Sequence, residues 1–325
     1  MIDAGIVGLG WWGNVLVESV QGRSDRIRFV HGVARDPASK QEIARRHGLV
    51  LSPTLAAMLA DPAVQAVVLA TPHSLHRAEI EAVAAAGKPV FCEKPLTLTA
   101  ADAVAAVGAA RTAGTLLAVG HNRRFLPALG EMKRLLAAGE LGEVLHVEGH
   151  FSNENSSANF APWRHDAEES PAGGMTGTGI HVLDAFVSLL GPVRFVHAQL
   201  VSRKPAPGPL DTLSVLLRFA NDVTGTLSAV RATPRYWRTH LFGTKGSAEM
   251  LQEDTLLVHA VGQASPLRRA FPPVDTLRLE LEAFADAIEG RAPYPIDAAD
   301  MIATVAAFEA VCRSVKSGRT ETVGA

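Results

Sequence analysis

The sequence predicts an α/β first half built on a doubly wound parallel sheet, and an α+β second half built on an open, mostly antiparallel sheet. Short apolar runs alternate with helical stretches from residue 4 to residue 120, as expected of repeated βαβ units. A glycine-rich turn joins the first of these runs to the first helix. After Gly142, apolar and polar residues alternate at period two in several segments, which is typical of strands with one buried face.

The first turn carries a dinucleotide-binding pattern. The apolar run Ala4–Val7 leads into a predicted helix, Asn14–Val20, through the turn Gly8-Leu9-Gly10-Trp11-Trp12-Gly13. Gly8 permits the tight turn, Gly10 lets the backbone approach a pyrophosphate, and Gly13 allows close helix packing. Because the motif stands between a strand and a helix, we predict a Rossmann dinucleotide-binding domain over residues 1–121 rather than an incidental glycine turn. We interpret Trp11 and Trp12 as packing residues, with cover of the cofactor by one of them as the alternative.

The end of the second predicted strand, Ile27–Ala34, bears on the choice of nicotinamide cofactor. An acidic residue there would bind the ribose 2′-hydroxyl of NAD. This chain has Ala34 at that position, Arg35 directly after it and Lys40 nearby, which favours the 2′-phosphate of NADP. We therefore predict NADP as the preferred cofactor and NAD as the alternative, in which Arg35 is a solvated loop residue and Asp36 reaches the ribose.

The rest of the first half continues the alternation of strands and helices. Strands are predicted over 66–69, 90–92 and 116–119, and helices over 39–47, 54–60, 73–86 and 99–112. Thr71 and Pro72 follow the strand over 66–69, where a proline suits a wall against a flat ring. His73 and His76 start the next helix. We interpret His76 as a structural or capping residue, because a protonated imidazole there would oppose the helix dipole.

Charge collects where the strand over 90–92 stops. The strand ends abruptly in Glu93, Lys94 and Pro95, and Pro95 ends the ladder because it has no N–H to donate. In open α/β sheets ligands bind at the carboxyl edge, so Glu93 and Lys94 are placed where a cofactor and a substrate can meet. The alternative is an ordinary surface Glu-Lys pair.

The second half, residues 122–325, is predicted to be a substrate-binding and oligomerisation domain. Strands are expected over 144–149, 193–203, 213–219, 225–230, 239–242, 248–251 and 255–259, with terminal helices over 277–289 and 297–316. We expect the last helix to pack back on the first domain. The strand over 213–219 buries one apolar face but places Leu216 on the other. This favours a homo-oligomer, a dimer or tetramer, with cover by the chain's own helices as the alternative.

A second polar constellation lies after the first strand of that half. The loop Phe151–Ala172 contains Trp163-Arg164-His165-Asp166 and leads through a glycine-rich segment into a helix that ends at Leu190. His181 and Asp184 lie three residues apart and project from one side of this helix. A histidine there can exchange a proton with a substrate hydroxyl while the carboxylate orients the ring. The alternative is a hydrogen-bonded core histidine.

Composition excludes several classes of protein. With 325 residues, 47% hydrophobic and 20% charged, the chain is long enough for two globular domains. Lys plus Arg at 31 against Asp plus Glu at 33 gives a net charge of -2, which argues against nucleic acid or a membrane surface as a partner. Cys92 and Cys312 lack disulfide or metal-ligand spacing, so no metal site is predicted and a reducing cytoplasm fits. We expect no signal peptide and no membrane span, since no apolar run reaches ~18 residues.

Taken together, these motifs resemble the Gfo/Idh/MocA family of oxidoreductases. The likeness rests on the glycine turn, Thr71-Pro72 with His76, Glu93-Lys94-Pro95, Asn122-Arg123-Arg124-Phe125, Trp163-Arg164, and the Gly-Gly segment that leads to His181 and Asp184. The resemblance implies a Rossmann domain, an open mixed sheet, and hydride transfer between a nicotinamide and a sugar, polyol or related carbonyl compound. It also implies that Lys94 is the catalytic lysine, Glu93 the cofactor-side carboxylate and His181 the acid/base histidine, with a Lys94-Pro95 bond that is often cis.

Two positions depart from the family's pattern. Gly177 stands where an aspartate is common, four residues before the histidine, and His73 stands where an asparagine is common. The first departure removes an expected proton-network partner and hydroxyl ligand. Arg124, Arg164 and His165 would make the pocket more basic than a neutral polyol requires, which leads to the hypothesis of an acidic or keto-sugar substrate.

The leading prediction is an NADP-preferring oxidoreductase with a small-molecule substrate, in which Lys94 and His181 handle the hydroxyl proton. The predicted cofactor-binding residues are Gly8, Gly10, Trp11, Trp12, Gly13, Ala34, Arg35, Lys40, Thr71, Pro72, His73, His76, Glu93, Lys94 and Asn122. The predicted substrate-binding residues are Lys94, Arg124, Trp163, Arg164, His165 and His181. The alternatives are a non-catalytic cofactor-sensing regulator on the same fold, and an enzyme that never releases its cofactor.

Overall fold

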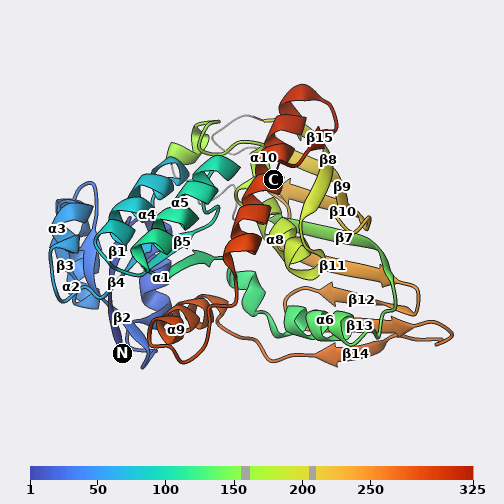
Figure 1. The fold of residues 1–325 in the computed structure, drawn as a ribbon, viewed down its shortest axis with the longest axis horizontal. Coiled ribbons are helices and arrows are strands. Elements are labelled where there is room, and N and C mark those ends of the chain that lie inside the picture. The colour runs from blue at the N-terminus through green and yellow to red at the C-terminus, as the bar shows by residue number, and fades with distance from the viewer. Residues whose placement is uncertain (155–161, 205–209, 325) are drawn as a thin grey trace. The chain divides into compact units, whose positions relative to one another are not determined.

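The computed structural model describes residues 1–154, 162–204 and 210–324, and the chain divides into two compact units (Figure 1). Unit 1 comprises Met1–Asn122 and Asp275–Met301, and unit 2 comprises Arg123–Val274 and Ile302–Ala325. Each unit is built on one sheet.

Unit 1 contains a six-stranded parallel sheet in the order β3-β2-β1-β4-β5-β6. Its strands are β1 (Ile2–Val7), β2 (Ile27–Val33), β3 (Val50–Ser52), β4 (Ala66–Leu69), β5 (Val90–Glu93) and β6 (Leu117–Gly120). Its helices are α1 (Trp11–Val20), η1 (Ala38–Lys40), α2 (Gln41–His47), α3 (Leu55–Leu59), η2 (His73–Leu75), α4 (His76–Ala85), α5 (Ala100–Ala113) and α9 (Thr276–Ile288). The doubly wound parallel sheet predicted from the alternation is confirmed. No residue range had been predicted for the three-residue edge strand β3, because it is too short to show a period.

The core of unit 1 explains why its central strands read as unbroken apolar runs. Every residue of β4 and β5 is buried, as expected of parallel strands covered on both faces. The rings of Phe91 on β5 and Phe284 on α9 meet edge to face with centroids 5.7 Å apart. Helix α9, from the last part of the chain, therefore belongs to unit 1, and the expectation for the last helix stays a prediction.

Unit 2 contains a nine-stranded sheet in the order β14-β13-β12-β11-β7-β10-β9-β8-β15. Its strands are β7 (Val144–Asn153), β8 (Val193–Ser202), β9 (Asp211–Phe219), β10 (Thr224–Arg231), β11 (Tyr236–Gly243), β12 (Gly246–Leu251), β13 (Thr255–Ala260), β14 (Leu267–Ala270) and β15 (Glu321–Thr322). The helical elements are α6 (Pro127–Ala137), η4 (Pro162–His165), η5 (Gly173–Met175) and α8 (Gly179–Leu190), together with most of η3 (Asn122–Phe125) and of α10 (Ala298–Ser317), whose first residues belong to unit 1. Among these strands β7 and β10 pair in parallel and the other pairs are antiparallel, so the mostly antiparallel sheet is confirmed.

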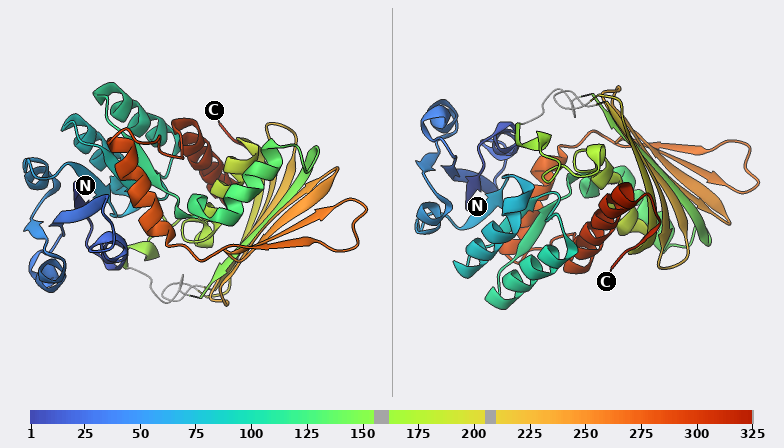
Figure 2. Two further views of the ribbon diagram at one scale, coloured as in Figure 1. Left: turned by 90° about the horizontal axis from the view of Figure 1, so that it is seen from below. Right: turned by 90° about the horizontal axis from the view of Figure 1, so that it is seen from above.

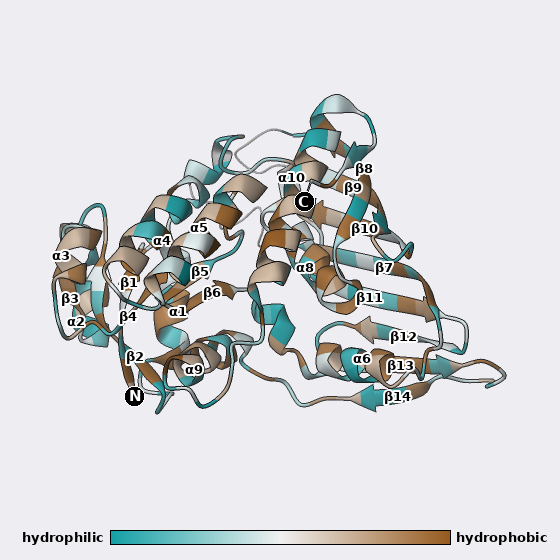
Figure 3. Cartoon of the chain, viewed as in Figure 1, coloured by the Kyte–Doolittle hydropathy of each residue, from teal (hydrophilic) through white to brown (hydrophobic). Residues whose placement is uncertain are grey.

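Hydrophobic and hydrophilic residues alternate along strands of this sheet (Figure 3), and along β9 every second residue is buried, so the two faces differ. The helices α8 and α10 lie on one side of it (Figure 2). Gly149 on β7 allows α8 to approach, because a Cβ there would lie 2.3 Å from Val182 and 2.6 Å from Phe186. On the other face, Leu216 and Val201 are 59% and 53% exposed.

Two searches cover the described residues alone. No helix among them combines the length and apolar character needed to cross a membrane. Within those same ranges, histidine, cysteine, aspartate and glutamate side chains form no group that could hold a metal ion.

Candidate active site

Close contacts require two of the three glycines of the turn after β1, and the third has open space beside it among the described residues. Gly8 has φ +95°, and a Cβ there would lie 2.5 Å from the carbonyl oxygen of Ala70, which follows β4. A Cβ at Gly13 would lie 2.1 Å from the Gly8 oxygen, so this glycine allows α1 to approach the turn. A Cβ at Gly10 would meet nothing within 4 Å. The second glycine therefore leaves the backbone open on the side from which a ligand can approach.

The first turn of α1 is suited to an anion. Gly10 is the N-cap residue, so no side chain caps the helix, and its first turn holds no acidic residue. The N–H groups of that turn are left for a bound group such as a pyrophosphate. Trp11 is 59% exposed, so it is not a core packing residue, and its ring lies 5.5 Å from that of Trp12.

The end of β2 places a basic side chain at the surface. Ala34 is buried, and Arg35 beside it is exposed. Asp36 is engaged in its own turn, where its Oδ1 accepts a hydrogen bond from Ala38 N at 3.1 Å. Lys40 ends the short helix η1 that follows. The carboxylate that was the alternative ribose ligand is thus already hydrogen-bonded, while the neighbouring guanidinium faces solvent.

The turns after β4 and β5 are joined by a buried histidine. His76 is fully buried at the start of α4; its Nδ1 lies 2.9 Å from Pro95 O and its Nε2 lies 3.1 Å from Thr71 O. This is the structural role predicted for His76. The Thr71 hydroxyl donates to Glu79, whose pKa is raised by burial. Pro72 is partly exposed, and His73 is buried with its ring edge-on to His76.

Glu93 and Lys94 are buried at the carboxyl end of β5, with 5% and 9% of their surface exposed. The alternative of a surface ion pair is therefore wrong. Lys94 N donates to Glu93 Oε2 at 3.1 Å, and the Lys94–Pro95 bond is cis. Asn122 follows β6 at the same edge of the sheet, and its side chain donates to Thr276 Oγ1 at 2.8 Å. Burial of a charged lysine is unusual because it is costly, and the predicted roles of Lys94 and Glu93 stay predictions.

In unit 2, Arg124 and Asp184 are bound to each other. Arg124 Nε and Nη2 each donate to one oxygen of Asp184 at 2.8 Å, and the two side chains are only 1% and 2% exposed. This pair joins η3 to α8. The predicted role of Asp184 toward the imidazole, and that of Arg124 toward the substrate, stay predictions.

His181 lies among aromatic side chains that the sequence did not single out. It is 6% exposed on α8, and its ring meets that of Phe151 edge to face with centroids 5.9 Å apart. Phe151 in turn packs edge to face on Trp237, at 5.3 Å. The Arg123 guanidinium lies 4.5 Å from the centroid of Phe151. The period-two alternation of side chains along β7 could have identified Phe151, because it lies on the same face of this strand as buried Val147.

The polar loop before α8 is described only in part. Residues 155–161 lie outside the described ranges, and so does the side chain of His165. Trp163 and Arg164 belong to η4, where the Arg164 guanidinium lies 4.5 Å from the Trp163 ring centroid. Among the described residues, a Cβ at Gly177 would meet no heavy atom within 4 Å.

Comparison with known proteins decides the family. Residues 2–121 match the model of an oxidoreductase family with an NAD-binding Rossmann fold, and residues 129–249 match the GFO/IDH/MocA C-terminal domain. Inositol 2-dehydrogenase 1 of Saccharopolyspora erythraea is 31% identical over 98% of this chain and 95% of that protein. This chain belongs to the Gfo/Idh/MocA family. The predicted family is confirmed, and the protein is an NAD-binding oxidoreductase.

Other known proteins are also similar to this chain. The 2,7-anhydro-N-acetylneuraminate hydratase of Escherichia coli is 30% identical over 78% of this chain and 69% of that protein. A solved oxidoreductase from Desulfitobacterium hafniense, described as NADPH-dependent, superposes with a TM-score of 0.87 at 26% identity over 99% of this chain and 97% of its own. A levoglucosan dehydrogenase in complex with NADH and levoglucosan shares the fold, with a TM-score of 0.87 at 24% identity over the full length of both chains.

The carboxyl edge of the unit 1 sheet fits the dinucleotide of the Gfo/Idh/MocA family. The open backbone at Gly10 and the uncapped start of α1 would hold the pyrophosphate. The positions at the ends of β2, β4, β5 and β6 would line the rest of the cofactor.

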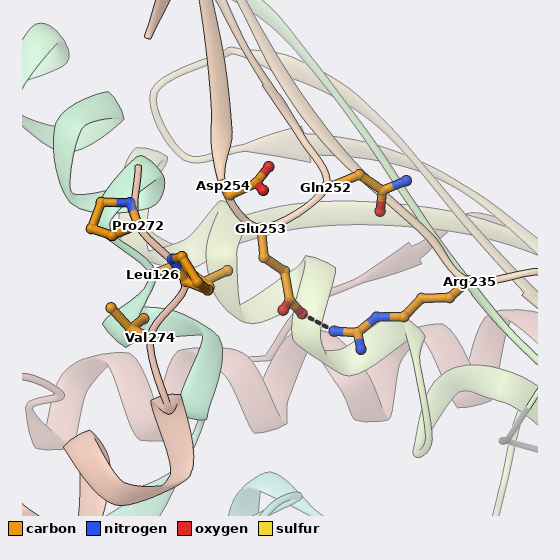
Figure 4. Close-up of a pocket in the computed structure, with 8 residues that line it drawn as sticks. Leu126, Arg235, Gln252, Glu253, Asp254, Pro272 and Val274 are labelled. Carbon is orange, nitrogen blue, oxygen red and sulfur yellow. Dashed lines mark hydrogen bonds and ion pairs between the residues drawn. The ribbon is translucent and has the colours of Figure 1, made fainter. Parts of the chain in front are cut away.

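A pocket of about 230 Å³ lies elsewhere in unit 2 (Figure 4). It is lined by Leu126, Arg235, Gln252, Glu253, Asp254, Pro272, Pro273 and Val274. The Glu253 carboxylate forms an ion pair with Arg235 in this pocket and another, at 3.3 Å, with Arg123. None of the predicted site residues lines this pocket, so we do not assign the reaction to it.

Proposed function

We propose that this protein is an NADP-preferring dehydrogenase or reductase that interconverts a carbinol and a carbonyl group in a sugar, polyol, sugar acid or keto sugar. The observation that carries the proposal is the buried amine of Lys94, which stands beside Glu93 in a unit whose glycine turn is shaped for a dinucleotide. Two relatives named as inositol 2-dehydrogenases support a polyhydroxylated substrate.

The protein's own residues are proposed to supply position and charge. A bound nicotinamide supplies the hydride chemistry at its C4 atom. Lys94 is proposed to place its positive charge at the substrate oxygen, where it stabilises developing negative charge. His181 is proposed to give or take the hydroxyl proton, with its ring plane fixed by contact with Phe151.

Asp184 and Arg124 are proposed to act on this reaction through the fold. The carboxylate of Asp184 is bound on both oxygens by Arg124, so we propose that it fixes α8, which carries His181. The same pairing neutralises Arg124. The hypothesis of an acidic substrate then depends on Arg164 and His165. If the protein bound neutral and carboxylated substrate analogues with equal affinity, this hypothesis would be contradicted.

The proposed function is tested by offering the purified protein NADP or NAD with a panel of sugars, polyols, sugar acids and their keto forms. The absorbance of the reduced nicotinamide reports turnover. We expect turnover of at least one member of the panel. Cofactor binding without any turnover would instead favour the regulator, and a nicotinamide that co-purifies and does not exchange would favour an enzyme that never releases its cofactor.

The NADP preference is proposed from the exposed Arg35 and the engaged Asp36. Arg35→Ser should lower the ratio of kcat/KM for NADP to that for NAD by about 10-fold or more, since charge-assisted contacts to a phosphate contribute about 1.5–3 kcal/mol. The measurement is initial rate against cofactor concentration for both cofactors. Arg45→Ser is the matched control, an exposed arginine on α2, and should leave the ratio unchanged. An unchanged ratio in Arg35→Ser would show that the 2′-phosphate is bound elsewhere.

A homo-oligomer through the uncovered face of the unit 2 sheet is also proposed. Leu216 and Val201 are exposed on that face, while α8 and α10 lie on the other (Figure 2). Light scattering should give a mass of two or four chains, and a monomer would remove the proposal.

The reducing cytoplasm remains the proposed location of the protein.

A further inference from the structure

A buried ion pair in unit 2 has no part in the proposed chemistry. Asp211 begins β9 and Arg231 ends β10, and they are 4% and 6% exposed. Arg231 Nε lies 3.2 Å from Asp211 Oδ1. Burial raises the pKa of the Asp211 carboxyl and lowers the pKa of the Arg231 guanidinium. A buried pair often stabilises a fold no more than apolar residues of similar volume would, so its contacts are the informative feature.

Both members of the pair hold the turn that precedes α8. Arg231 Nη2 donates to Gly173 O, and the Gly174 backbone lowers the pKa of the Asp211 carboxyl against the larger effect of burial. Gly173 has φ +58°, and a Cβ there would lie 2.9 Å from Asp211 Oδ2. The pair therefore fits against the backbone of this turn with no space for a side chain between them.

Hydrogen bonds continue from the turn to the backbone of His181. The N–H and the hydroxyl of Thr178 both donate to Gly174 O at 2.9 Å. The N–H of His181 donates to Thr178 O at 3.2 Å. Thr178 is the N-cap residue of α8 and is 1% exposed. The start of α8 is thus tied to Asp211 and Arg231 through a continuous set of buried contacts.

We propose that Asp211 and Arg231 are positioning residues that set the start of α8 and, through it, the place of the His181 imidazole. The inference rests on the proposed role of His181 in proton transfer. Misplacement of a catalytic group by about 1 Å costs about 10²-fold in rate, so loss of the pair should act on the chemical step.

The test compares Asp211→Asn, Thr178→Val, His181→Ala and the double variant Asp211→Asn/His181→Ala by steady-state kinetics. We expect Asp211→Asn to lower kcat by about 10- to 100-fold, with the affinity for NADPH unchanged because the cofactor residues lie in unit 1. Thr178→Val keeps the ion pair and removes only the hydroxyl, so it should give a smaller fall in kcat. It also keeps the test decisive if Asp211→Asn does not fold.

The double variant separates positioning from general stability. If Asp211 acts through His181, Asp211→Asn should have no further effect on kcat in the His181→Ala background. Ser314→Ala is the matched control, because Ser314 is fully buried on α10 and binds β8 rather than the turn. The inference is overturned if Asp211→Asn and Thr178→Val leave kcat unchanged, if Asp211→Asn lowers kcat equally in both backgrounds, or if Ser314→Ala lowers kcat as much. Full turnover by His181→Ala would instead overturn the proposed role of His181, and the inference with it.

Discussion

Lys94→Ala is expected to abolish turnover while leaving the affinity for NADPH nearly unchanged. The amine is buried at the end of β5, and its proposed place is at the substrate oxygen. Removal of one donor to a developing oxyanion typically costs 10²–10³ in kcat, and loss of proton handling adds to this, so we expect a fall of at least about 10³-fold. Single-turnover absorbance gives the rate of the chemical step, and nicotinamide fluorescence gives the cofactor affinity.

Lys88→Ala is the matched control for this result. Lys88 lies at the other end of the same strand, just before β5, where its ammonium donates to Val64 O. It is far from the carboxyl edge, so kcat should stay within about two-fold of wild type, as for most substitutions away from a site. Turnover of Lys94→Ala above a tenth of the wild-type rate would remove this lysine from the mechanism.

Arg124→Met is expected to have the largest effect on stability, a loss of about 3–5 kcal/mol in the free energy of unfolding. The substitution leaves the Asp184 carboxylate buried and without its bidentate partner. Urea denaturation measures the loss.

The loss of stability in Arg124→Met is compared with the losses in a double variant and in a surface variant. Arg124→Met combined with Asp184→Val replaces both charges with apolar groups, and should be more stable than Arg124→Met alone. Arg218→Met removes an ion pair with Asp222 whose side chains are 51% and 65% exposed, and should cost less than about 1 kcal/mol. Equal losses in Arg124→Met and Arg218→Met would show that the buried pair is not a stabilising contact.

The sequence by itself determined the features that depend on local chemistry. Three patterns can be identified from residues that are close together in the sequence: the glycine turn, the alternation of strands and helices, and the period-two pattern after Gly142. They predicted both sheets, while the family came from the resemblance of the whole set of motifs to Gfo/Idh/MocA proteins. The sequence also placed Lys94 at the carboxyl edge of the sheet, because Pro95 cannot donate a hydrogen bond and therefore ends the strand directly after Lys94.

Only the tertiary structure decided which side chains meet. Arg124 and Asp184 are 60 residues apart in the chain, and nothing in either local pattern shows that they bind each other. Phe151 and Trp237 meet through the pairing of β7 with β11, and Asp211 and Arg231 meet through the pairing of β9 with β10. These contacts depend on strand order and register, which long-range packing sets and which a local period in one sequence does not encode.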